Sequence, residues 1–196
     1  MKENMKKKRC EWVNNQNDLY IKYHDEEWGI PVHNDRKLFE MLILEGAQAG
    51  LSWETVLKKR KNYKKAFDNF NPEKIAKYKK KKEAKLLQDA GIIRNRLKVK
   101  SSIQNAKVFL EIQKEFGSFD AYIWSFVNNK PIQNCCKSSS ELPVKTELSD
   151  AISKDLKKKG MSFVGSTIIY AFLQTVGIVN DHIISCYRYR EVQDGK

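Results

Sequence analysis

Helical periodicity runs through most of the chain, and turn residues punctuate it. Apolar side chains recur at intervals of three and four residues over 36–48, 53–67 and 95–116, which predicts amphipathic helices there. Ser52 and the pair Asn71-Pro72 are typical helix starts, and Gly117 is a typical helix end. No stretch alternates as a strand does. We therefore expect an all-α fold, one compact domain of about eight or more helices.

The second half of the chain has one gap in this pattern. Residues 128–147 contain two prolines and three consecutive serines without an apolar period, so we expect one long loop. Shorter helices are expected over 72–78, 81–89, 119–127, 150–159, 163–176 and 180–187. The folded domain should span 9–190, between a basic, disordered extension over 1–8 and a frayed tail over 191–196.

Charge adds the first indication of a partner. The 196 residues include 37 Lys and Arg against 24 Asp and Glu, a net charge of +13, which favours an acidic partner. Among acidic partners, nucleic acid is the first candidate and an anionic membrane the second. A lysine-rich solvated surface without a partner would give the same net charge. The uncharged run 163–179 is too short and too polar to span a membrane and is better explained as a buried helix. We expect a soluble, cytoplasmic protein.

Two pairs of Cys and His residues, far apart in the sequence, indicate a metal site. On the helix expected over 180–187, His182 and Cys186 are four residues apart and would share one face. Cys10 and His24 flank a short helix expected near the N-terminus and would complete the set. Two Cys and two His suit tetrahedral Zn²⁺ and leave no open coordination position, so the site would be structural. Simple packing of these side chains is the alternative.

A turn between two short helices could hold a DNA phosphate. Gly91 can adopt a positive φ, and the next helix would begin just beyond it with free backbone N–H groups. Arg94, Arg96 and Lys98 follow closely and add positive charge. An ordinary helical hairpin would produce the same sequence.

Glu45 and the residues around it suggest a pocket for a base. Glu45 falls on the apolar face of its helix, where a carboxylate must be paired, neutral or available to a ligand. Small residues follow it, and then Trp53. An enzyme that acts on a flipped base needs aromatic faces and a polar group for the base edge. The alternative is an aromatic core in which Glu45 bonds a helix end. Further aromatic faces near the N-terminus are Trp12, Tyr20, Tyr23 and Trp28.

Taken together, these residues form motifs that resemble a known family over nearly the whole chain. The motifs are Arg9-Cys10-x-Trp12, Tyr20-x-x-Tyr23-His24-Asp25-x-Glu27-Trp28-Gly29, Leu38-Phe39-Glu40-x-x-x-Leu44-Glu45-Gly46-x-Gln48-Ala49-Gly50-Leu51-Ser52-Trp53, Asp89-Ala90-Gly91-Ile92-Ile93-Arg94, Trp124-Ser125-Phe126-Val127-Asn128, Phe163-Val164-Gly165 and Asn180-Asp181-His182. Their order and spacing resemble the DNA-3-methyladenine glycosylase I family. The resemblance implies an all-α helix–hairpin–helix glycosylase with a structural zinc.

The resemblance also assigns roles to individual residues. It places Glu45 and Tyr23 at the catalytic centre. The zinc ligands that it implies are Cys10, His24, His182 and Cys186, and the residues that bind the base are Glu45, Trp12, Tyr20, Tyr23 and Trp53. The pair that enters the duplex is Gly50 and Leu51. The residues that contact the DNA backbone are Gly91, Ile92, Arg94, Arg96 and Lys98.

The activity that the resemblance implies is excision of 3-methyladenine from alkylated double-stranded DNA, leaving an abasic site for base excision repair. Free 3-methyladenine would be the product, one Zn²⁺ per chain the only cofactor, and the monomer the working form. The wider superfamily uses a catalytic aspartate, and this sequence offers no convincing candidate. Two alternatives are a sibling glycosylase with another lesion preference and a zinc-stabilised DNA-binding protein without catalysis.

Overall fold

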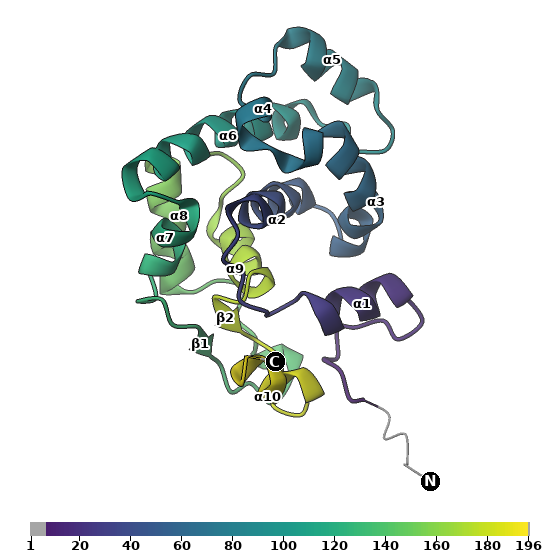
Figure 1. Cartoon of the computed structure of the whole chain (residues 1–196). Helices are drawn as coiled ribbons and strands as arrows, with labels where there is room; N and C mark the ends of the chain where they lie inside the picture. The colour runs from purple at the N-terminus through teal and green to yellow at the C-terminus, as the bar shows by residue number, and fades with distance from the viewer. Residues whose placement is uncertain (1–6, 196) are drawn as a thin grey trace.

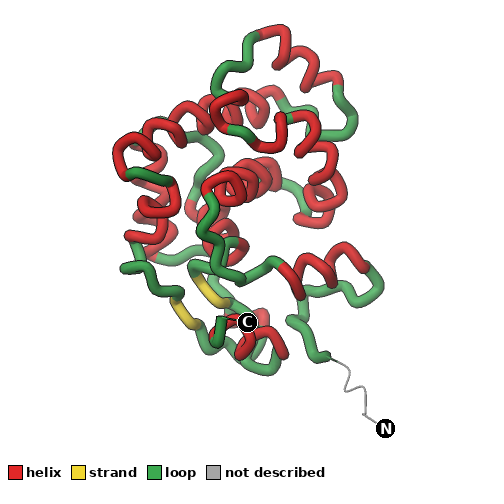
Figure 2. The backbone as a smooth tube through the Cα atoms, viewed as in Figure 1, coloured by secondary structure: helices red, strands yellow, loops and turns green. Residues whose placement is uncertain are grey.

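The computed structural model describes residues 7–195 (Figures 1 and 2). Most of the predicted basic extension therefore lies outside the described residues. Within them the chain is mostly helical, as predicted. The α-helices are α1 (Asp18–Glu26), α2 (Asp35–Gln48), α3 (Trp53–Ala66), α4 (Pro72–Ile75), α5 (Lys80–Gln88), α6 (Arg96–Phe116), α7 (Phe119–Ser125), α8 (Glu147–Lys158), α9 (Ser166–Thr175) and α10 (Tyr187–Gln193). Two 3-10 turns, η1 (Asp68–Phe70) and η2 (Ser139–Glu141), and two strands, β1 (Ile132–Gln133) and β2 (Val179–Asn180), complete the order.

The core is built around α2, which lies at the centre of the molecule in Figure 1. Leu38, Phe39 and Leu42 of this helix are fully buried and repeat at helical spacing. The helix packs against α9, α3, α6 and α7. Because α2 is covered on several sides, its C-terminal end is held firmly, and that end supplies Glu45.

Several helix boundaries follow the predicted capping residues. The Ser52 hydroxyl accepts a hydrogen bond from the backbone N–H of Thr55 at the start of α3. Asn71 caps α4 in the same way, with Pro72 at the first helical position. Gly117 follows the last residue of α6 with a φ of 83°. The predicted helices in the first two thirds of the chain are present, although α4 ends at Ile75 and α7 at Ser125, earlier than predicted.

The turn between α5 and α6 has a different geometry from the one expected. Gly91 is not among the glycines with positive φ. Glycine is needed there for space, because a Cβ atom would lie 2.9 Å from Asp89 Oδ1 and 3.0 Å from Asn62 Cβ. The N–H groups of Gly91 and Ile93 already donate to the Asp89 carboxylate and to the Tyr63 hydroxyl. The N–H groups of Gly91 and Ile93 are therefore not free to bind a phosphate, contrary to what the sequence had suggested.

The last third of the chain departs most from the sequence predictions. The segment 128–147 is not one loop, because β1 pairs in parallel with β2 and η2 forms a 3-10 turn. The helix predicted over 150–159 begins at Glu147, capped by Thr146. No helix covers 180–187: residues 181–186 are non-helical, and α10 begins only at Tyr187. That last helix continues to Gln193, into the segment predicted as a frayed tail.

The apolar segment before residue 179 forms a buried helix, as predicted. Ile169, Phe172 and Leu173 of α9 are fully buried against α2 and α8. Among residues 7–195, no helix is both long enough and apolar enough to cross a membrane.

Candidate active site

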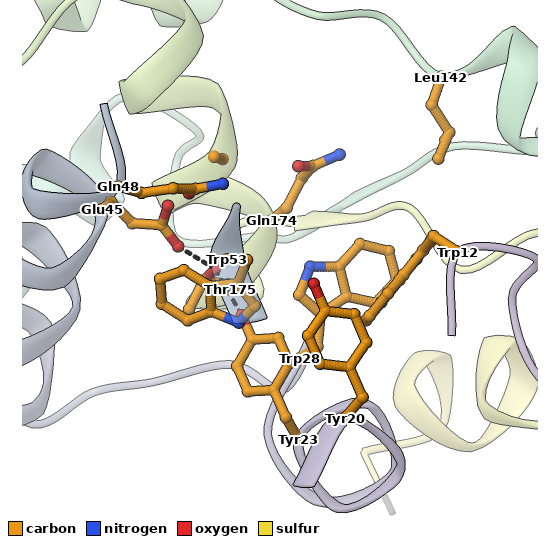
Figure 3. A pocket seen from close by; sticks show the side chains of 11 residues that line it. Trp12, Tyr20, Tyr23, Trp28, Glu45, Gln48, Trp53, Leu142, Gln174 and Thr175 are labelled. Carbon is orange, nitrogen blue, oxygen red and sulfur yellow. Dashed lines mark hydrogen bonds between the residues drawn. The ribbon is translucent and has the colours of Figure 1, made fainter. Parts of the chain in front are cut away.

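Four helices, α1, α2, α3 and α9, and the segment before α1 meet at a cavity of about 250 Å³ (Figure 3). Helix α1 contributes Tyr20 and Tyr23, α2 contributes Glu45 and α3 contributes Trp53. The five aromatic residues predicted from the sequence all line this cavity; they are Trp12, Tyr20, Tyr23, Trp28 and Trp53. The structure therefore brings together the base-pocket candidates, which are scattered along the sequence between Trp12 and Trp53.

The aromatic rings form a continuous wall. The Tyr23 and Trp53 ring centroids are 5.2 Å apart with their planes tilted by 48°. Trp12 meets Tyr20 edge to face at 5.7 Å and Trp28 edge to face at 4.9 Å. Aromatic pairs favour these tilted and edge-to-face arrangements. Each ring packs against another ring of the wall, and this packing fixes the orientation of the ring faces that line the cavity.

Glu45 lies in this cavity with only 3% of its surface exposed. Its Oε1 accepts a hydrogen bond of 2.7 Å from the Thr175 hydroxyl. The Thr175 oxygen lies 2.9 Å from the Tyr23 hydroxyl, which donates to it because the single Thr175 proton is used on Glu45. Burial raises the pKa of Glu45 to about 8, although the hydrogen bond from Thr175 acts in the opposite direction.

Three buried polar atoms of the cavity have no partner among the described residues. They are the Oε2 of Glu45 and the indole Nε1 atoms of Trp12 and Trp53. A buried polar atom without a hydrogen bond costs about 1–3 kcal/mol, so such atoms are uncommon. An acceptor and two donors left unpaired in one aromatic cavity fit a planar heterocycle that supplies both donors and acceptors.

Sequence analysis missed several polar residues of the cavity. Gln48 lies one helical turn after Glu45, whereas Gln174 and Thr175 are the polar residues at the end of the apolar helix α9. The presence of polar residues in an otherwise apolar helix was the available signal. Leu142, from the segment predicted as a loop, lies at the edge of the same cavity.

A cluster of two cysteines and two histidines lies behind the aromatic wall. Cys10, His24, His182 and Cys186 are all buried, and their ligand atoms lie within 4.8 Å of one another. Cys10 Sγ is 3.5 Å from His182 Nδ1, and Cys186 Sγ is 3.4 Å from His24 Nε2. A tetrahedral zinc with ordinary bond lengths sets sulfur and nitrogen ligands about 3.6 Å apart. The four residues could therefore hold a metal ion, although His182 and Cys186 converge through a non-helical segment.

Hydrogen bonds orient both histidines toward the centre of the cluster. The second ring nitrogen of His24 is 2.8 Å from Asp25 Oδ1, and that of His182 is 3.0 Å from the Trp28 carbonyl oxygen. These contacts leave His24 Nε2 and His182 Nδ1 as the ligand atoms, the arrangement typical of metal-bound histidines. Burial alone would raise the pKa of Asp25, but hydrogen bonds from Arg9 and His24 lower it to about 2.

The cluster and the aromatic wall are in direct contact. Trp28 packs edge to face on His182 at 4.6 Å and on Trp12 at 4.9 Å. Trp12 also lies 5.4 Å from the His24 ring. Packing of Trp12, the first wall residue in the sequence, thus depends on residues near the C-terminus.

The residues predicted to contact DNA occupy different environments. Leu51 is 41% exposed, and nothing lies within 4 Å of a Cβ atom placed at Gly50. The pair lines a neighbouring hollow that shares Glu45 and Gln48 with the cavity, so it lies at the cavity rim. Arg94 and Arg96 are exposed as predicted. Ile92 is buried, so its side chain belongs to the core. Lys98 is also buried, and its ammonium binds backbone carbonyl groups inside the protein, which contradicts an exposed phosphate contact.

Comparison with known proteins agrees with this geometry. The family model described as methyladenine glycosylase matches residues 12–189. DNA-3-methyladenine glycosylase 1 of Escherichia coli (strain K12) is 50% identical over 181 residues, which are 92% of this chain and 96% of the relative. A crystal structure of 3-methyladenine DNA glycosylase I superimposes with a TM-score of 0.89 at 49% identity, covering 92% of this chain and 98% of the other. The Staphylococcus aureus structure described as the structural basis of 3-methyladenine recognition has a TM-score of 0.86 at 34% identity, covering 88% and 92%.

Proposed function

The chain belongs to the methyladenine glycosylase family, and we propose that it is a monofunctional DNA N-glycosylase that excises 3-methyladenine from alkylated DNA. The observation that supports this most strongly is the cavity with Glu45 Oε2 and two indole N–H groups unpaired between aromatic faces. A base rotated out of the duplex needs such a pocket.

Glu45 would select the methylated base by charge and by hydrogen bonding. Its free oxygen accepts from the exocyclic amine of the flipped base, while Thr175 holds the other oxygen. Adenine methylated at N3 in DNA is a cation. Its charge beside Oε2 favours ionisation of Glu45, whose pKa in the empty pocket is about 8, and the resulting carboxylate stabilises the cation more than neutral adenine. The aromatic wall of Trp12, Tyr23 and Trp53 stacks on the base, and a cation strengthens that stacking.

The reaction itself asks little acid–base chemistry of the protein. The bond between the sugar C1′ and the base nitrogen breaks, and its electron pair neutralises the positive charge of the leaving base. Water adds to C1′ and loses a proton, which leaves an abasic site. An unmodified adenine would need protonation first, and a carboxyl group with a pKa of about 8, as Glu45 has, is only a weak acid for that step.

We also propose that the Cys and His cluster binds one structural Zn²⁺. Its support is the separation of ligand atoms and the hydrogen bonds that orient both histidines. All four ligands are protein side chains, so a tetrahedral ion has no open position for substrate. Its role would be to tie the segment before α1 to the segment before α10.

The DNA surface that we propose combines the rim of the cavity with the α5–α6 turn. Leu51 would enter the duplex where the base has left, and the exposed Arg94 and Arg96 would contact the backbone. The fold connects these features through the core, since α6 packs on α2 and α5 packs on α6.

The test is base release from duplex DNA methylated at several positions, with the released bases separated by chromatography. We expect 3-methyladenine to be released much faster than 7-methylguanine or unmodified adenine. Preferential release of another base would assign a sibling specificity, and binding without any release would identify a non-catalytic DNA-binding protein. DNA incubated without the protein measures spontaneous loss of the same bases.

A further inference from the structure

Lys98 carries a charge but lies inside the protein. Only 8% of its surface is exposed. Its Nζ donates hydrogen bonds of 2.8 Å to the Ala47 carbonyl oxygen and 2.7 Å to the Ala49 carbonyl oxygen. No salt bridge involves Lys98 within residues 7–195. The ammonium is therefore held by two carbonyl oxygens, which carry the partial negative charge at the C-terminus of α2.

The turn that Lys98 holds lies at the rim of the base cavity. Helix α2 is capped at Ala49, Gly50 has a φ of 74°, and the Leu51 N–H donates to the Gln48 carbonyl at 2.7 Å. Gln48, between the two carbonyl groups bound by Lys98, lines the cavity that contains Glu45. The exposed Leu51 side chain follows directly. One ammonium group thus fixes the residues that join the base cavity to Leu51.

The backbone of Lys98 belongs to the other proposed DNA contact. Lys98 lies in the first turn of α6, where its N–H and that of Leu97 donate to the side chain of the capping residue Asn95. Arg94 and Arg96, four and two residues before Lys98, are exposed. A single residue therefore connects the α5–α6 turn with the Ala49–Leu51 turn, which is distant in the sequence.

We infer that Lys98 is a positioning residue, which holds the Ala49–Leu51 turn against α6 so that a duplex bound at the α5–α6 turn meets Leu51 beside the base cavity. This inference rests on the proposed function. Hydrogen bonds from a charged donor are stronger and better aligned than neutral ones. A small displacement of the inserting side chain is costly, because a misplacement of about 1 Å can reduce a rate about a hundredfold.

The experiment compares Lys98→Met with Lys107→Met. Methionine keeps most of the length of the side chain but removes the donors and the charge. Lys107 lies more than two turns further along the same helix and is exposed, so its replacement controls for the lost charge. We expect Lys98→Met to slow excision from duplex DNA at saturating protein by about tenfold or more, as loss of charged hydrogen bonds does. Its affinity for free 3-methyladenine should stay within about twofold of wild type, and Lys107→Met should match wild type in both.

A double-mutant cycle with Leu51→Ala separates positioning from a general loss of structure. If Lys98 acts through Leu51, replacing Lys98 in the Leu51→Ala protein should cost little more, so the two effects will not add. Additive effects, unchanged excision by Lys98→Met, or a large loss of free-base affinity would each overturn the inference. Should Lys98→Met not fold, Lys98→Gln retains a neutral amide donor group without the charge and is put through the same cycle.

One readout does not depend on base release. A duplex with 2-aminopurine beside an abasic-site analogue reports unstacking when a side chain inserts, and Lys98→Met should lower this fluorescence change while Lys107→Met preserves it. If wild-type protein released no 3-methyladenine, the proposed function would fail. The role of Lys98 would then be judged by this signal, and an equal signal from wild type and Lys98→Met would refute it.

Discussion

Glu45 divides its two carboxylate oxygens between the protein and the cavity. Oε1 is held by Thr175, and Oε2 has no partner among the described residues. The Glu45 carboxyl group has a pKa of about 8 in the folded protein and near 4.5 in the unfolded chain. The folded protein therefore binds a proton at Glu45 more tightly than the unfolded chain does. The stabilisation from that proton is complete below about pH 4.5 and is lost as the pH rises to about 8, at about 1.4 kcal/mol per pH unit at most.

Glu45→Gln should therefore weaken base binding and leave the fold intact. Replacing a charged acceptor costs about 1.5–3 kcal/mol, so affinity for free 3-methyladenine should fall roughly ten- to a hundredfold. The melting temperature should hold or rise, more at pH 8 than at pH 5, because the variant has no carboxylate to deprotonate inside the protein. Calorimetric binding and thermal melts at both pH values measure the two effects.

Glu111→Gln, a charge change on the exposed part of α6, is the control and should alter neither quantity. A Glu45→Gln protein with a much lower melting temperature and unchanged base selectivity would show that Glu45 serves only the fold. Affinity for undamaged duplex should be the same in all three proteins, since Glu45 does not face the proposed backbone contacts.

Residue-scale prediction worked where one position broke a local pattern. Glu45 was identifiable because a carboxylate on an apolar helix face is unusual, and the structure places it in the cavity. Thr175 and Gln174 were not identifiable as its neighbours, because 130 residues separate Thr175 from Glu45 in the chain. Lys98 was misassigned, since a lysine after two arginines gives no sign that it reaches carbonyl groups of another helix.

At the scale of elements, the end of α9 depends on a glycine with no room beside it. Gly177 has a φ of 70°, and a Cβ atom there would lie 2.3 Å from the Ile30 carbonyl carbon and 2.4 Å from Pro31 N. These are backbone atoms that cannot move aside. Gly177→Ala should cost about 3 kcal/mol or more from overpacking and left-handed strain, which corresponds to roughly 6–12 °C in Tm.

Gly117→Ala isolates the strain from the steric clash. Gly117 also has a positive φ, 83°, but nothing lies within 4 Å of a Cβ atom placed there. Its replacement should cost only about 1–2 kcal/mol. Equal Tm values for the two variants in differential scanning calorimetry would contradict the close approach between Gly177 and the Gly29–Pro31 segment.

Element prediction succeeded where capping residues mark a boundary and failed where tertiary pairing replaced a helix. The spacing of Val179, Ile183 and Cys186 is compatible with a helix. In the structure, Ile132 N–H instead donates to the Ile178 carbonyl, and Ile184 N–H donates to the Cys136 carbonyl. Those partners come from the segment expected to be a loop, so nothing local in the sequence announced them.

At the scale of the whole molecule, the metal cluster joins segments that lie far apart in the sequence. Metal analysis should find one zinc per chain, and Cys186→Ala should lower stability by about 3 kcal/mol or more because a coordinated ion contributes folding free energy. The change corresponds to a fall in Tm of roughly 6–12 °C. Excision at low temperature should fall far less, since no step of the proposed reaction passes through the metal.

Cys135→Ala is the matched control, because Cys135 is exposed and outside the cluster. It should keep both the zinc and the melting temperature of wild type. Protein purified without added chelator that contains no zinc, or equal melting temperatures for the two cysteine variants, would contradict the proposed site.

The contact between Trp12 and the Cys and His cluster also has a consequence for synthesis on the ribosome. The first aromatic residues of the cavity emerge early, whereas His182 and Cys186, which belong to the cluster that braces them, are translated long afterwards. Helices α5 and α6 and the basic side chains near their turn are translated well before that point. A chain interrupted between Phe116 and His182 would therefore contain the proposed backbone contacts without the complete cluster that braces the aromatic wall.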